Sequence, residues 1–220
     1  MAQVLTVNVA HRRPNRAEGR AVTGIDKRPV DGPVAVRAPG PMHGGLGSGL
    51  VGDTIGDRQH HGGDDQAVYA YAREDLDAWQ GTLDRRITNG GFGENLTTAG
   101  VDVTNAVIGE RWQIGTRGLV LEVSRPRIPC RTFANWLDIN GWVKTFTATA
   151  VPGAYLRLTR PGSVAAGDQI VVTDRPDHGI TIGFVFRALT LEPALLPEAL
   201  RADALPRPLR ELAERRIDTR

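Results

Sequence analysis

Glycine and proline limit what this chain can fold into. The 220 residues include 26 Gly and 14 Pro, which leaves little room for long uninterrupted helices. Between them lie short segments rich in β-branched side chains, each ending at a turn, as is typical of strands. These segments occupy residues 4–10, 67–71, 106–114, 119–124, 154–159, 169–174 and 180–186. Many short strands with few helices between them predict a mainly β fold, either an antiparallel barrel or a folded sheet.

Helices are expected at a few places only. Apolar residues repeat at helical spacing within residues 73–83, and residues 132–137 form a second short helix. From residue 191 the composition changes to Leu, Ala, Arg and Glu, which predicts helices at 197–205 and 208–217. Their apolar faces fit either one end of a barrel or a partner. We therefore expect a β domain over residues 1–190 and a short helical C-terminal extension over residues 191–220.

Composition excludes several classes of protein. Lys and Arg number 27 and Asp and Glu 25, and aromatic residues are 5%, so we expect no nucleic-acid partner. No apolar run reaches the roughly 18 residues of a membrane span, so we expect no membrane partner. A single cysteine excludes a disulfide framework and a multi-cysteine metal site. The first residues lack the pattern of a secretory signal, and we expect a cytoplasmic protein that is a monomer or a homodimer.

The segment SRPRIPCRTF (124–133) carries the most chemical information. Arg125, Arg127 and Arg131 flank Cys130, the one thiol, just before a predicted helix. Nearby cations favour the thiolate, which attacks electrophiles and binds soft metals. A buried structural cysteine is the simpler interpretation, and the local sequence leaves both open.

Three other segments are rich in glycine or in cations. In residues 52–71, His60 and His61 precede two glycines. This segment could face an anion or form a surface loop. A zinc site is a poor hypothesis, because adjacent histidines point apart. Residues 90–100 match neither a Rossmann fingerprint nor a P-loop, so Asn95 there has a turn or a ligand role. A hydrolase pairing Cys130 with His60 or His61 also stays open, whereas no serine-hydrolase motif is present.

Taken in order, these segments resemble the MOSC domain family, named for the C-terminal domain of molybdenum cofactor sulfurase, and in particular its small stand-alone bacterial members of the YiiM type. The resemblance covers about residues 20–187. It rests on Lys-Arg-Pro-Val (27–30), Gly-Asp…His-Gly-Gly…Ala-Val-Tyr-Ala-Tyr (52–71), Gly-Phe-Gly-Glu-Asn-Leu-Thr (91–97), Ile-Gly (108–109) and Ser-Arg-Pro-Arg-x-Pro-Cys (124–130).

The resemblance implies a β-barrel of the pyruvate-kinase type that binds the molybdenum cofactor, a molybdopterin with a terminal phosphate. Cys130 matches the position whose thiolate ligates the metal and would be the catalytic residue. Pyridoxal phosphate binding is also associated with the family. The cofactor-binding candidates, for the phosphate and the pterin, are Lys27, Arg28, His61, Gly62, Gly63, Asn95, Arg125, Arg127 and Arg131.

The activity implied by the resemblance is reduction of N-hydroxylated small molecules, such as hydroxylaminopurines or amidoximes. Electrons would come from a separate donor protein, because the chain has no flavin or iron–sulfur motif. Two alternatives remain. Cys130 could carry a persulfide in a sulfur-carrier or cofactor-delivery module, or the protein could bind without catalysing. Gln66 stands where relatives often have a cation, and this removes a possible phosphate contact. It slightly favours the alternative in which the protein binds without catalysing.

Overall fold

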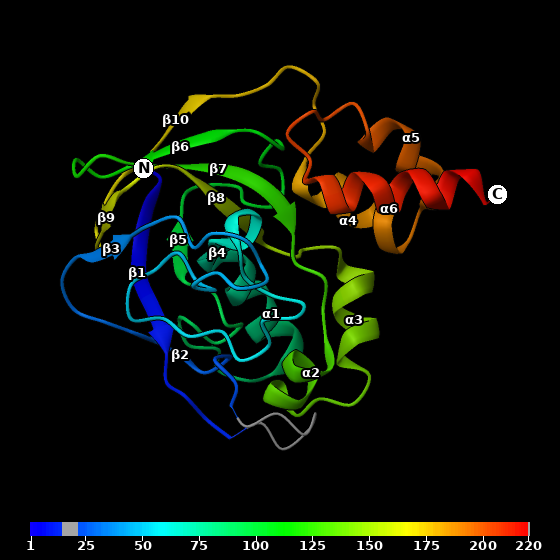
Figure 1. Cartoon of the computed structure of the whole chain (residues 1–220). Helices are drawn as coiled ribbons and strands as arrows, with labels where there is room; N and C mark the ends of the chain where they lie inside the picture. The colour runs from blue at the N-terminus through cyan, green and yellow to red at the C-terminus, as the bar shows by residue number, and fades with distance from the viewer. Residues whose placement is uncertain (15–21, 220) are drawn as a thin grey trace.

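A mainly β architecture is confirmed by the computed structural model, which describes residues 1–14 and 22–219 (Figure 1). Within that part of the chain, eight strands form one sheet in the order β10-β6-β7-β8-β4-β5-β1-β2, and β3 pairs with β9. The strands are β1 Gln3–Ala10, β2 Lys27–Pro29, β3 Val34–Val36, β4 Val68–Ala72, β5 Leu96–Ala99, β6 Arg111–Ile114, β7 Leu119–Pro126, β8 Ala154–Arg160, β9 Gly162–Val164 and β10 Ile170–Asp174.

The sheet bends back toward its own far edge. The Val4 N–H donates to the Asp168 carbonyl at 2.8 Å, and the Ile170 N–H donates to the Ala2 carbonyl at 2.9 Å. These bonds hold the start of β1 beside the chain that enters β10, although the two strands are far apart in the strand order. A fully closed barrel is not established by this pairing, and that part of the expectation stays a prediction.

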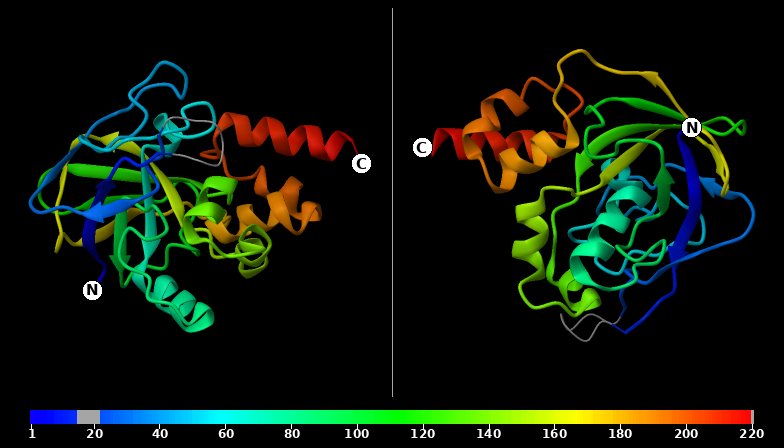
Figure 2. Two further views of the ribbon diagram at one scale, coloured as in Figure 1. Left: turned by 90° about the horizontal axis from the view of Figure 1, so that it is seen from below. Right: turned by 180° about the vertical axis from the view of Figure 1, so that it is seen from behind.

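Short helices surround the sheet. The α-helices are α1 Arg73–Leu83, α2 Arg131–Leu137, α3 Trp142–Thr149, α4 Ile182–Thr190, α5 Leu196–Ala199 and α6 Arg207–Asp218, with 3₁₀ turns η1 Asp64–Gln66 and η2 Pro193–Leu195. Figure 2 shows α4, α5 and α6 gathered on one side of the sheet. In the described residues, none of these helices is both long and apolar enough to cross a bilayer.

The segment 180–186 was expected to be a strand, and this prediction is wrong. The chain begins α4 there, because the Thr181 hydroxyl accepts the Phe184 N–H at 3.1 Å and caps the first turn. The buried residues Ile182 and Val185 are three apart, which is helical rather than alternating spacing. An apolar β-branched run of this length is compatible with a strand or a helix, and here the N-cap hydrogen bond selects the helix.

Three smaller differences concern element bounds. Only Arg111–Ile114 of the expected strand 106–114 is extended, because Glu110 donates its N–H back to Val107 in a turn. The helix expected at 197–205 is reduced to α5, and α3 was not expected. The second tail helix is confirmed as α6. Its Leu209 joins the main core, so the tail packs on the domain.

Two of the three hydrophobic clusters in the described residues position the site, and the third joins α4, α5 and α6. One fills the space enclosed by the sheet, with Val68, Leu121 and Leu156 fully buried in it. The other is aromatic and lies among α1, α2, α3 and the loop before β5. Its fully buried rings include those of Phe92 and Phe133, whose centroids are 5.2 Å apart at an edge-to-face angle. This aromatic cluster fixes α2 against the loop 88–95, and both carry residues of the site described next.

Candidate functional site

Cys130 lies where β7 gives way to α2. The strand ends at Pro126, the chain runs irregularly through Pro129, and Cys130 occupies the N-cap position with extended backbone angles. The thiol is partly buried rather than enclosed in the core. It contributes to the walls of two neighbouring cavities, which separates it from an inert structural cysteine.

The first cavity, called the Lys27 cavity, has an empty volume of about 700 Å³, part of it open to solvent. Its walls come from segments far apart in the sequence: residues 22–25 and Lys27, residues 53–57, His61, Gly62, Gln66 and Tyr69, Gly93 and Asn95, and Arg127, Cys130 and Thr132, together with Tyr155. The second cavity, called the Arg125 cavity, has an empty volume of about 1020 Å³, also partly open. The residues that line both are Asp57, His61, Gln66, Cys130 and Tyr155.

The ammonium group of Lys27 forms a buried ion pair within the protein. Its Nζ lies 2.6 and 2.7 Å from the two carboxylate oxygens of Asp53, and the side chains are 8% and 1% exposed. Burial pushes the pKa of Asp53 up, but Lys27 and hydrogen bonds from Ser48 and Asn95 outweigh it and lower the pKa. Lys27 therefore lines the cavity, as predicted, but the carboxylate of Asp53 already neutralises its charge.

Asn95 is similarly occupied. Its Nδ2 donates to Asp53 at 2.9 Å and its Oδ1 accepts the Tyr69 N–H at 3.1 Å. It lies in the wall of the Lys27 cavity, as the sequence led us to expect. The amide is nevertheless used to join β4, the loop before β5 and Asp53, so its direct role toward a ligand stays a prediction.

Arg127 is buried at 5% exposure and holds the Phe92 loop. Its Nη1 donates to the Phe92 carbonyl, and its Cζ lies 3.9 Å from the Phe133 ring centroid and 5.0 Å from that of Tyr69. Burial alone would lower the pKa of Arg127, but nearby Tyr69, Tyr155 and Cys130 raise it. The guanidinium is thus charged, structural, and a source of positive potential in the Lys27 cavity.

The pKa of His61 responds to that positive potential as well as to burial. Burial, and then the positive charges of Arg127, His60 and Arg125, lower its pKa from 6.5 to about 4, against a hydrogen bond with Gln66. The imidazole is therefore neutral near pH 7. Among the described residues no hydrogen bond joins Cys130 to His60 or His61, so the structure adds no support for a cysteine–histidine hydrolase.

Arg125 differs from the other cations of the site. Its Nε is buried and has no hydrogen-bond partner in the described structure. Burial lowers the pKa of Arg125, while Tyr155 and Asp65 oppose the shift. Arg125 and Arg131 both line the Arg125 cavity, so two of the predicted arginines lie together beside Cys130.

Two predicted cofactor contacts lie outside both cavities. Arg28 is 53% exposed at its side chain and pairs with Asp26 at 3.0 Å, and it borders a separate groove beside Trp136. Gly63 packs against Met42, whereas Gly62 reaches the Lys27 cavity.

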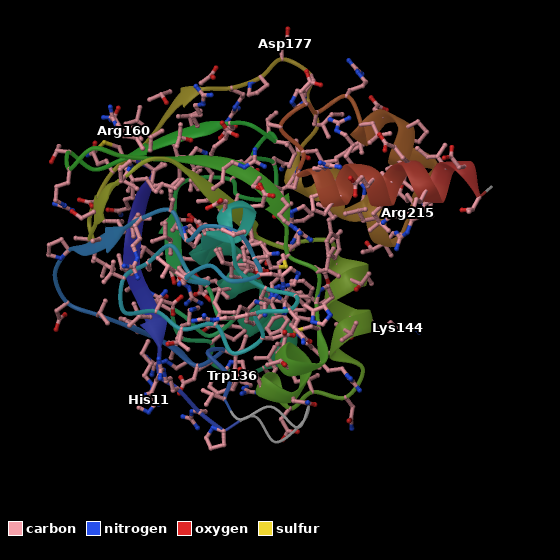
Figure 3. All side chains as sticks on the ribbon, viewed as in Figure 1. His11, Trp136, Lys144, Arg160, Asp177 and Arg215 are labelled. Carbon is pink, nitrogen blue, oxygen red and sulfur yellow. The ribbon has the colours of Figure 1, made fainter. Side chains whose placement is uncertain are left out.

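Trp136, labelled in Figure 3, donates from its indole to the Gly91 carbonyl at 2.8 Å. It supports the glycine-rich loop from the side of that separate groove, so this face holds the loop in place.

Sequence reasoning missed Asp53, Tyr69 and Tyr155 as residues of the site. Tyr69 and Tyr155 come from strands read only as core, and their rings lie 5.0 Å apart. The Gly-Asp pair at 52–53 was the available signal for the carboxylate. In the described residues, no cluster of three His, Cys, Asp or Glu side chains could hold a metal ion by itself.

Comparison with known proteins defines the class of protein that has this fold and site. The MOSC domain model matches residues 57–171, more than half of the chain, and this protein belongs to the MOSC domain family. It is 31% identical to the uncharacterized protein YflK of Bacillus subtilis over 185 residues, covering 84% of this chain and 79% of YflK. It also superposes on the crystal structure of YiiM from Geobacillus stearothermophilus with a TM-score of 0.78 and 28% identity, over 98% and 99% of the two chains.

A third relative has a functional name. A protein named reductase from Gibberella moniliformis is 27% identical over 176 residues, which span 79% of this chain. They span only 29% of that protein, so most of it has no counterpart in the match. Together the comparisons show a small, YiiM-like MOSC protein.

Proposed function

We propose that this protein is an oxidoreductase that binds the molybdenum cofactor through Cys130 and reduces N-hydroxylated small molecules. The observation that carries the proposal is the place of Cys130, a partly buried thiol in the common wall of two cavities and close to three arginines. The reductase-named relative supports the reaction class but not the substrate. A separate protein supplies the electrons.

The donor set of the site fits such a cofactor. One thiolate, with no cluster of other protein ligands in the part of the chain that the structure describes, suits a metal whose remaining ligands arrive with an organic group. The buried Nε of Arg125 lacks a partner, as expected of a donor held ready for an anion. When bound, the cofactor would supply a metal able to exchange two electrons with the substrate.

The residues of this chain have separate tasks in this proposal. Cys130 holds the metal, and Arg125 and Arg131 hold negative charge in the Arg125 cavity. Arg127 stays bound to the Phe92 carbonyl and favours the thiolate of Cys130 electrostatically. His61, neutral near pH 7, is a hydrogen-bonding group rather than a cation at this wall.

Metal and pterin content tests the proposal directly. Protein produced in a cofactor-competent host is expected to contain near-stoichiometric molybdenum and pterin, and Cys130→Ala is expected to lose most of the metal while remaining folded. Arg201→Gln is the control, because Arg201 is an exposed arginine paired with Glu198 outside both cavities. Wild-type protein free of molybdenum, or a Cys130→Ala variant with full content and turnover, would contradict the assignment.

One observation favours a second candidate function, sulfur transfer. Cys130 is partly exposed at the Arg125 cavity, which opens to solvent, so a thiolate of another protein could approach it. The outer sulfur of a persulfide would arrive from one thiolate and leave to another, with no external oxidant. A sulfane-sulfur mass increment on Cys130 in protein that contains no molybdenum would favour this function over the first.

A further inference from the structure

A separate groove beside Trp136, called the Trp136 groove, lies outside the two cavities that meet at Cys130. Its empty volume is about 1290 Å³, part of it open to solvent. It is lined by residues of β2, of α1 and the chain that follows α1, and by Trp136 of α2. Among the described residues, Lys27 alone lines both this groove and one of the two cavities. The groove is therefore a distinct surface that touches the candidate site at one point.

Ion pairs neutralise two of the cations that line the Trp136 groove. Lys27 is paired with Asp53, and Arg73 is paired with Asp77 at 2.8 Å. Arg73 also donates to the Ile87 carbonyl at 3.0 Å and so holds the chain that follows α1. A partner could use either cation only by breaking these contacts, which is costly where the side chains are buried. These two residues build the groove and leave binding to others.

Positive charge remains where Arg28 and Arg86 line the groove. Arg28 is 53% exposed at its side chain and pairs with Asp26 at 3.0 Å, but the same carboxylate also accepts from Arg13 at 2.5 Å. Arg86 is exposed and has no hydrogen-bond or ion-pair partner among the described residues. One carboxylate thus faces two arginines, and a further arginine faces none. This part of the groove is complementary to a negatively charged surface.

Trp136 gives the groove an aromatic wall. Its ring is half-buried, whereas each of the other three tryptophans of the chain is at most 3% exposed. The indole bond to the Gly91 carbonyl, at 2.8 Å, and the Arg13 guanidinium carbon, 5.5 Å from the ring centroid, hold the ring in place. Tryptophan and arginine are enriched among the residues that dominate binding energy at protein–protein interfaces. A fixed, accessible tryptophan beside incompletely neutralised arginines fits an acidic protein surface.

The Trp136 groove and the Lys27 cavity share a wall. The glycine-rich loop places Gly91 in the lining of the groove and Gly93 in the lining of the cavity. Cys130 is the N-cap of α2, and Trp136 lies six positions further along the same helix. Six residues correspond to about 9 Å along a helix axis. A protein bound in the groove would therefore lie close to Cys130 without entering either cavity.

We infer that the Trp136 groove is the docking surface for an acidic face of the electron-donor protein. The inference rests on the proposed function and adds the place and the chemistry of its protein partner. A redox partner must bind and leave at each delivery of electrons, and such encounters use small, charged interfaces.

The electron balance defines what this partner supplies. Reduction of an N-hydroxylated substrate takes two electrons and two protons: the N–O bond breaks, an N–H bond forms, and the oxygen leaves as water. The donor protein is the reductant and is oxidised by the same two electrons, and the protons come from solvent.

Donor-dependent kinetics test the inference through Arg86→Glu. Reduced flavodoxin, a small acidic flavoprotein, is the donor, and reduced methyl viologen, a small cation, replaces it in a parallel assay with the same neutral amidoxime. Arg86→Glu is expected to raise the KM for flavodoxin at least about fivefold, with kcat for flavodoxin and viologen-driven turnover within about twofold of the wild type. The wild-type KM for flavodoxin should also rise at least about fivefold between about 0.05 M and about 0.5 M salt, because salt screens the attraction.

The matched control is Arg215→Glu. Arg215 is also an exposed arginine without a partner among the described residues, and it lies on α6, away from Trp136 (Figure 3). Its kinetics should match the wild type with both donors.

Calorimetry with oxidised flavodoxin measures docking without turnover. At about 0.05 M salt the wild type and Arg215→Glu are expected to bind alike, and Arg86→Glu at least about fivefold more weakly. This measurement needs no bound molybdenum, so it distinguishes the two failures. Wild-type protein that binds flavodoxin as expected but turns over with neither donor would sink the proposed function and leave the docking surface in place.

Three results would overturn the inference while viologen-driven turnover is normal. The first is a wild type that flavodoxin does not reduce, or equal KM and equal affinity for flavodoxin in wild type and Arg86→Glu. The second is equal weakening in Arg215→Glu, because binding would then follow net charge rather than the groove. The third is inorganic pyrophosphate that binds the wild type as tightly as flavodoxin and loses that affinity in Arg86→Glu, which would assign the groove to a small anion.

Discussion

The depressed pKa of His61 makes a sharp prediction about stability at acid pH. In the folded protein burial and the arginines lower this pKa to about 4, whereas the ordinary value is 6.5. The unfolded chain therefore binds a proton at His61 before the folded chain does. Between these two pH values the proton favours unfolding, so stability falls as the pH is lowered.

The size of the effect follows from the shift. Each pKa unit corresponds to roughly 1.4 kcal/mol, so the shift contributes at most about 3 kcal/mol of lost stability between pH 7 and pH 4. Replacing His61 by glutamine removes the titration while keeping a polar side chain. The wild type should lose about 3 kcal/mol more than His61→Gln over that interval, because carboxylates that titrate in both proteins cancel in the comparison.

Urea unfolding at closely spaced pH values measures the difference. His43→Gln is the matched control, since His43 is an exposed histidine that lines neither cavity. Its pH profile should follow the wild type. Parallel profiles for wild type and His61→Gln would refute the reasoning, because burial and the nearby positive charges would then not lower the pKa of His61 in the folded protein.

Three further changes have definite expected outcomes. Asp53→Asn leaves Lys27 buried without its carboxylate and should destabilise the protein by about 3–5 kcal/mol in urea unfolding. Gly62→Ala places a Cβ 2.7 Å from the Gly47 carbonyl oxygen at a φ of +90°. The variant should lose about 1–3 kcal/mol of stability, measured as a melting temperature lower by several degrees. Arg28→Ala should leave molybdenum content unchanged, because Arg28 lies outside both cavities; a clear loss would restore it as a phosphate contact.

Local sequence was sufficient where one residue pattern had one interpretation. The bounds of α1, Arg73–Leu83, agree with those expected, because Leu76 and Trp79 mark a single buried face. The class of fold followed from glycine and proline spacing for the same reason. Prediction from local sequence failed at α4. An apolar β-branched run there suits a strand or a helix, and the hydrogen bond of the Thr181 cap selects the helix.

The candidate site shows a different limit. The segment around Cys130 predicted a thiol among arginines, and the structure brings Arg125 and Arg131 to its cavity. No local pattern could show that Lys27 is neutralised, because Asp53 lies 26 positions further along the chain. The fold alone decides which cations keep an unmet hydrogen-bonding capacity.

That distinction changes how basic residues in such a motif should be weighed. A cation already joined to a buried carboxylate must lose that bond before it can hold a ligand, so its contribution to binding is the difference of two similar energies. A buried guanidinium nitrogen with no partner loses nothing when an anion arrives and gains a charge-assisted bond. By this argument Arg125 should contribute more to anion binding than Lys27, even though both were equal candidates in the sequence.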